Sequence, residues 1–111
     1  MYTMQDTQAT LTGATTANVC SGKVFERSPV NGMARISLVG EAAGESRATV
    51  YIGGRVIYPE GPISRQNRVP VMPDDVLMTT PIGRGEQIVI SIRNTGGGTN
   101  TIFWRVDIKP R

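Results

Sequence analysis

The clearest alternation of apolar and polar residues lies in the last third of the chain, between Arg84 and Ile108. Two runs there place every second side chain on one side of an extended strand: Ile88, Ile90 and Ile92 in the first, and Ile102, Trp104, Val106 and Ile108 in the second. This period of two, in residues that favour strands, predicts two β-strands. The intervening NTGGGTN contains three glycines, which accept positive φ. We therefore expect an antiparallel hairpin with the isoleucines and the tryptophan facing inward.

Trp104 is the single tryptophan of the chain. Because it shares the apolar side of its run, we expect it to be the largest core residue. The alternative is an exposed platform that stacks on a sugar ring. Tyr51 and Tyr58 are better placed for that role because they are close to expected loops.

Shorter patterns of the same kind precede this region. Strands are predicted at residues 18–27 (with a bulge at the glycine), 33–39, 47–52 and 56–58, and a short strand or a turn at residues 76–78. Turns rich in Gly, Pro and Asn are predicted at residues 28–32 and 59–62. No segment has helical periodicity. The pattern predicts an all-β fold, an antiparallel β-sandwich or jelly roll with roughly seven or eight short strands.

The first 17 residues differ from the rest because Thr, Gln, Ala and Gly dominate and apolar anchors are few. Two interpretations stay open, a frayed terminus and an extended arm that becomes ordered on a neighbouring molecule. We predict the arm over residues 1–17 and a single β-sandwich domain over residues 18–111.

Composition favours assembly over catalysis. The 111 residues suffice for one domain, and the hydrophobic fraction of 39%, with 13 Gly and 7 Pro, predicts a lightly filled core that partner subunits would complete. The net charge of +3 comes from basic residues, almost all arginine, that are spread along the chain. Without a basic cluster or an aromatic platform, nucleic-acid binding is not expected.

Candidate catalytic chemistry is sparse. The chain has no histidine, and its nine acidic residues are scattered, with Asp74 and Asp75 as the only adjacent pair. The single cysteine, Cys20, excludes an intrachain disulfide and is expected to be a small buried residue. We expect no enzyme activity, no metal and no cofactor. No apolar run could cross a bilayer and no signal peptide is evident, so synthesis in the cytoplasm is expected.

The stretch GRGEQIVISIRNTGGGTNTIFWRVDI resembles the closing strands of small all-β virion proteins of tailed bacteriophages. The size, the Thr/Ala/Gly-rich start, the absence of histidine and the single cysteine resemble capsid decoration (cement) proteins. The resemblance implies a homo-oligomeric, typically trimeric, β-sandwich on the outer capsid surface of the virion. There it would bind between major capsid protein subunits and stabilise the head.

Partner-binding residues are expected in the arm and in a proline-bounded loop. The candidates are Tyr2, Met4, Thr10, Leu11, Arg65 and Arg68, of which the two arginines could pair with acidic capsid patches. The alternatives are a carbohydrate- or receptor-binding module of a tail fibre or spike, and a head-completion or tail protein.

Overall fold

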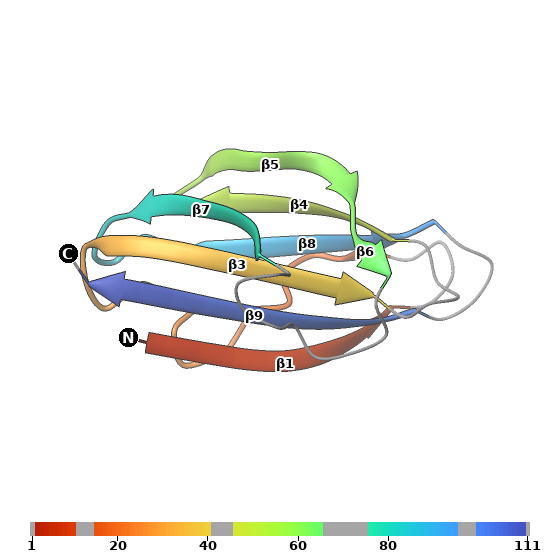
Figure 1. Ribbon diagram of the computed structural model, residues 1–111, viewed down its shortest axis with the longest axis horizontal. Helices are drawn as coiled ribbons and strands as arrows, with labels where there is room; N and C mark the ends of the chain where they lie inside the picture. The colour runs from red at the N-terminus through yellow and green to blue at the C-terminus, as the bar shows by residue number, and fades with distance from the viewer. Residues whose placement is uncertain (1, 11–14, 41–45, 66–75, 96–99, 111) are drawn as a thin grey trace.

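The computed structural model describes residues 2–10, 15–40, 46–65, 76–95 and 100–110. Within these ranges the chain is all-β and forms two sheets that pack face to face as a sandwich (Figure 1). The strands are β1 (Tyr2–Thr10), β2 (Thr15–Thr16), β3 (Gly32–Gly40), β4 (Ser46–Ile52), β5 (Arg55–Pro62), β6 (Ser64–Arg65), β7 (Val76–Ile82), β8 (Ile88–Asn94) and β9 (Asn100–Pro110).

Each sheet is four strands wide. The first has the order β1-β9-β3, and both β7 and β6 pair with the remaining edge of β3. They occupy different parts of that edge, because β7 pairs with residues 32–37 and the two-residue β6 with Val39 and Gly40. The second sheet has the order β2-β8-β4-β5. Every pair is antiparallel except the short contact between β3 and β6.

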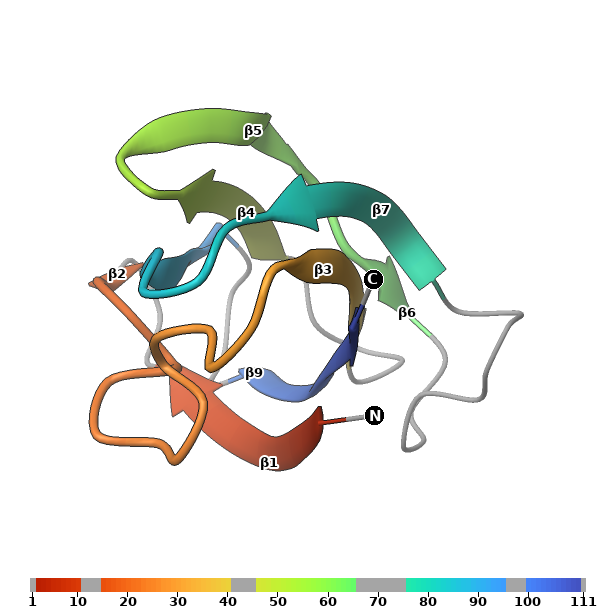
Figure 2. The ribbon, with the colours of Figure 1, turned by 90° about the vertical axis from the view of Figure 1, so that its left-hand side faces the viewer.

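The strand pairs follow the pattern of one long hairpin rolled into two layers. β1 pairs with β9, β2 with β8, β3 with β7, and β4 with β5. The tip of this hairpin is Gly53-Gly54, whose φ angles of 58° and 82° suit a two-residue turn of type I′. Two further pairs, β9 with β3 and β8 with β4, close the roll. This order defines a jelly roll, so the expected fold class is confirmed (Figures 1 and 2).

The core lies between the sheets and contains the apolar sides of the strands. Ile88, Ile90 and Ile92 are fully buried, and Trp104 is 1% exposed. Trp104 is among the largest fully buried side chains, so its prediction as a core residue is confirmed and the exposed platform is wrong. The other members with no exposed surface include Ile36, Ile52, Ile102, Val106 and Ile108.

The predicted hairpin between the last two strands is wrong. β8 pairs with β2 and β4, whereas β9 pairs with β1 and β3 in the opposite sheet. The alternation correctly predicted which side chains are buried. It could not predict the pairing, because two apolar faces are buried equally well when they face each other across a sandwich. The triple glycine at 96–98 lies outside the described residues.

Two predictions of local structure also need correction. Residues 18–27 do not form a continuous strand. Val19 N–H bonds to Ile90 O and Ile88 N–H to Glu26 O, but the residues between them make turns. Residues 59–62 are not a turn, because β5 continues through both prolines as an edge strand with an irregular register against β4.

The extended N-terminal arm is not confirmed. Instead, β1 pairs with β9 along its whole length, from Tyr2 opposite Ile108 to Thr10 opposite Asn100. Met4 is 6% exposed and belongs to the core. One apolar anchor is enough here because β9 supplies the backbone hydrogen-bond partners that a polar sequence needs to stay extended.

Candidate functional site

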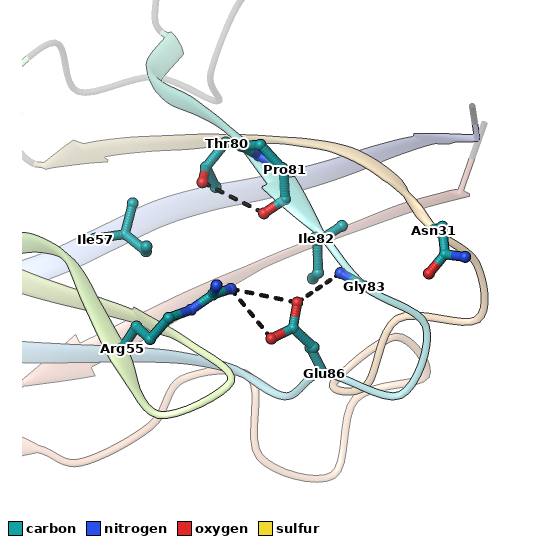
Figure 3. A pocket seen from close by; sticks show the side chains of 8 residues that line it. All are labelled: Asn31, Arg55, Ile57, Thr80, Pro81, Ile82, Gly83 and Glu86. Carbon is teal, nitrogen blue, oxygen red and sulfur yellow. Dashed lines mark hydrogen bonds and ion pairs between the residues drawn. The ribbon is translucent and has the colours of Figure 1, made fainter.

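An open groove of about 540 Å³ is lined by residues of β5 and β7, which are edge strands of the two sheets, and by residues of the adjoining turns. Figure 3 shows the side chains around it. Its lining combines polar and apolar groups: Asn31, Arg55, Ile57, Thr80, Pro81, Ile82, Gly83 and Glu86.

The turn between β7 and β8 forms one end of the groove. Glu86 N–H donates to Gly83 O at 3.0 Å, and Gly85 has φ of 84°, as the third residue of a type II turn requires. Arg84 N–H donates to Asn31 Oδ1 at 2.8 Å, and Gly85 N–H to Ser28 O at 2.8 Å. These bonds fix the turn to the segment that precedes β3.

Glu86 connects this turn to β5. Its Oε1 accepts the Gly83 N–H at 2.6 Å, and both carboxylate oxygens lie within 3.3 Å of Arg55 Nη2 (Figure 3). Arg55 also donates through Nε to Ile52 O at 3.2 Å. Because the Arg55 side chain is 61% exposed, this ion pair adds little to stability. Its effect is to hold the guanidinium group at the mouth of the groove.

The groove is suited to binding rather than to acid–base catalysis. Its single carboxylate, on Glu86, is engaged by Arg55 and by a backbone N–H. Among the described residues, no group of three or more His, Cys, Asp or Glu side chains could hold a metal ion. Ile57 and Ile82 offer apolar walls, and Asn31 and Arg55 offer polar groups, so a small polar ligand or a partner side chain would fit.

A second polar cluster lies on the outer face of the first sheet, where β1, β9 and β3 are neighbouring antiparallel strands. Asp107 is 1% exposed although its position on β9 faces outward. Its Oδ1 accepts hydrogen bonds from Thr3 Oγ1 at 2.7 Å and from Arg105 Nε at 3.1 Å. Arg35 Nη2 lies 3.8 Å from Oδ2, and that oxygen has no hydrogen-bond partner in the described part of the chain.

This cluster leaves two arginines fixed on a sheet face. The side chains of Arg35 and Arg105 are 34% and 29% exposed. Two guanidinium groups around one carboxylate give a positively charged patch with little freedom left to lose on binding. Such a patch is suited to contact with an acidic protein surface.

Four of the six expected partner-binding residues lie in the part of the chain that the structure describes, and they belong to different strands and environments. Met4 is in the core, and Tyr2 is half-buried with its ring 5.3 Å from that of Phe25, edge to face. Thr10 ends β1, and Arg65 belongs to β6 through its backbone. Leu11 and Arg68 lie outside the described residues, as do Asp74 and Asp75.

The aromatic residues do not form a sugar platform at the groove. Tyr51 and Tyr58 are half-buried, and neither lines the groove. Tyr58 packs so closely over Gly61 that a Cβ on this glycine would lie 2.4 Å from the phenol oxygen.

Cys20 is buried, as the sequence predicted. Desolvation by burial raises the pKa of its thiol to about 12. The thiol therefore stays protonated at neutral pH and is a packing group, not a nucleophile.

The residues that shape both polar sites were not predicted from the sequence. Arg55 directly follows the Gly53-Gly54 turn and is the first residue of β5, the second strand of this hairpin. Asp107 lies on the side of its strand opposite Ile102, Trp104 and Val106, and the alternation gave no sign that this side is covered. Arg105 lies two positions away on the same strand, but Thr3 and Arg35 belong to β1 and β3, which are distant in sequence, so local spacing could not reveal the cluster.

The comparisons with known proteins add no identification, since neither the family models nor the curated proteins contain a match to this sequence. In the ranges that the structure covers, no helix is long and apolar enough to cross a membrane.

Proposed function

We propose that the chain is a non-enzymatic structural protein of a bacteriophage virion. In this proposal it is a decoration protein that binds the outer capsid surface between major capsid protein subunits and stabilises the head. The observation that carries the proposal is the jelly-roll strand order, which recurs in viral capsid domains. This support is an analogy of fold, and the resemblance of the last third of the chain to phage virion proteins points the same way.

The surfaces of the molecule also support a role in assembly. The outer face around Arg35 and Arg105 offers fixed positive charge for an acidic patch on a capsid subunit. Many such contacts, each weak, would act together when repeated over a shell. We propose a homo-oligomer, with the trimer as the state that the resemblance implies, and synthesis in the host cytoplasm before attachment.

Binding to isolated heads tests this proposal. Purified chain should attach to heads that lack it and should raise the temperature at which they release DNA. The Arg35→Glu variant should attach at least tenfold more weakly. The double variant Arg65→Glu/Arg68→Glu should show the same loss if the proline-bounded loop contacts the capsid. Arg84→Glu is the matched control, because Arg84 is an exposed arginine in the turn between β7 and β8. Absence of the wild-type chain from the outer surface in an electron-microscopy map would overturn the proposal.

A second candidate rests on the groove between β5 and β7. Jelly rolls also occur in lectins, and the groove presents Asn31 and Arg55 beside apolar walls, as a carbohydrate- or receptor-binding module of a tail fibre or spike would require. Glycan binding that is lost in Arg55→Ala would favour this function. Tyr51→Ala and Tyr58→Ala should then have little effect, because these rings do not line the groove. A head-completion or tail protein would instead form rings in electron micrographs.

A further inference from the structure

The edge strands of the two sheets differ in how they are protected from pairing with other chains. β5 contains Pro59 and Pro62 and has an irregular register, and β7 contains Pro81 and a register shift against β3. β2 is two residues long. Prolines, bulges and short length are the usual means of preventing edge-to-edge association.

β1 has none of these protections. It is nine residues long and contains no proline, glycine or lysine, and its single charged residue is Asp6. It forms the lower margin of its sheet in both views (Figures 1 and 2). On the side away from β9, no backbone hydrogen bond joins it to another described segment. Lys23 contacts the Asp6 side chain and Phe25 the Tyr2 ring, and both of these β1 side chains share the face of buried Met4.

Two local hydrogen bonds show which backbone groups lie on the open edge. Thr7 N–H donates to Asp6 Oδ1 at 2.8 Å, and Ala9 C=O accepts from Gln8 Nε2 at 2.9 Å, so neither group is directed at β9. In an antiparallel pair the residues that face the partner alternate with those that face away. The open edge therefore carries the N–H and C=O groups of Thr3, Gln5, Thr7 and Ala9, of which the Thr7 N–H and the Ala9 C=O are bonded to the side chains of Asp6 and Gln8 in the single chain.

We propose that this edge pairs antiparallel with β1 of a second copy of the chain, about a two-fold axis at Gln5. The sequence is self-complementary around that residue, because threonines lie two positions before and two positions after it. Thr3 then faces Thr7 of the second copy, and Gln5 faces its own equivalent. Neutral hydrogen-bonding side chains of this kind make favourable cross-strand pairs.

The charged residue selects the same register. With the axis at Gln5, Asp6 lies opposite Met4 of the other copy. An axis at Asp6 would place two carboxylates directly opposite each other, which is unfavourable. The pairing of residues 2–8 would join two four-strand sheets into one continuous sheet along an edge of about 24 Å, given roughly 3.4 Å per residue. This inference is independent of the capsid role, and it predicts a two-fold dimer of free chains instead of the trimer that the resemblance implies.

The first test removes one backbone donor from the open edge. Gln5→Pro deletes an N–H that faces away from β9, so the ladder within the chain stays intact. Gln5→Thr is the matched control, because it keeps the N–H and a hydroxyl. In sedimentation experiments, wild type and Gln5→Thr should be dimers, and Gln5→Pro should dissociate at least tenfold more readily with an unchanged unfolding midpoint. A wild-type chain that stays monomeric at millimolar concentration would overturn the proposal, as would a Gln5→Pro dimer of wild-type affinity.

A cross-linking test covers the case in which Gln5→Pro does not fold. In a Cys20→Ala background, Gln5→Cys should form a disulfide-linked dimer on mild oxidation, since residue 5 lies opposite itself. Ala9→Cys is exposed on the same strand, but its two copies would be about 27 Å apart in this register, beyond disulfide reach. Equal cross-linking at both positions, or none at residue 5, would contradict the register.

Discussion

The hydroxyl of Thr3 donates a hydrogen bond of 2.7 Å to Oδ1 of Asp107, across 104 positions of sequence. The contact joins the first strand to the last, which are neighbours in one sheet. It shows how the long-range pairing of the rolled hairpin is reinforced by side chains on the outer face. Most of the residue contacts that maintain this fold are of the same long-range kind.

Asp107→Asn should destabilise the protein, because the carboxylate anchors Arg35 and Arg105 as well as Thr3. We expect the free energy of unfolding in urea to fall by about 2 kcal/mol, as for a buried charged group that loses its partners. Thr3→Val is the matched comparison, since it removes only the hydroxyl and should cost about 1 kcal/mol. A smaller loss in Asp107→Asn than in Thr3→Val would show that the arginines are not anchored as described.

Alanine substitutions at Gly53 and Gly54, in the turn between β4 and β5, should lower the stability of the protein by different amounts. Both have positive φ, so each substitution adds backbone strain of about 1 kcal/mol. At Gly53 the new Cβ would also lie 2.1 Å from Glu86 Oε2, whereas at Gly54 it would meet open space. Gly53→Ala should therefore lower the unfolding midpoint more than Gly54→Ala. Combining Gly53→Ala with Glu86→Ala should remove the difference, and an unchanged difference would exclude the steric explanation.

The buried thiol of Cys20 should make stability fall in alkaline solution. Its pKa is about 12 in the folded chain and 9.0 in its ordinary state. Between these values the unfolded chain releases a proton that the folded chain retains, so unfolding becomes more favourable as the pH rises. At pH 7 both states are protonated and the effect is absent. The stability of wild type relative to Cys20→Ala should fall by about 1 kcal/mol between pH 7.5 and pH 10, measured by urea unfolding. An equal pH dependence in both proteins would contradict this.

The alternation of residues predicted the composition of the core well. Burial along a strand has a period of two, so the inward sides of β3, β4, β8 and β9 follow directly from the sequence. The gap between the strands predicted at residues 47–52 and 56–58 contains Gly53 and Gly54, which form the turn there because few other residues accept positive φ at two successive positions.

The pairing of strands could not be predicted in the same way. Whether β8 pairs with β9 or faces it across the core depends on β1, β3 and β4, which compete for the same edges. β1 itself was interpreted as an arm because its polar composition carries no apolar period apart from Met4. The polar clusters around Glu86 and Asp107 are formed by this strand pairing, so local sequence patterns could not predict their positions either.

Amide hydrogen exchange along β1 tests the account most directly, because it reports both the pairing with β9 and the open edge. In dilute solution the amides of Met4 and Gln8, which face β9, should exchange slowly, and those of Thr3 and Gln5 should exchange fast. At high concentration the Thr3 and Gln5 amides should become protected as well. Fast exchange of all four amides at every concentration would show that this segment is a free arm and would contradict the account.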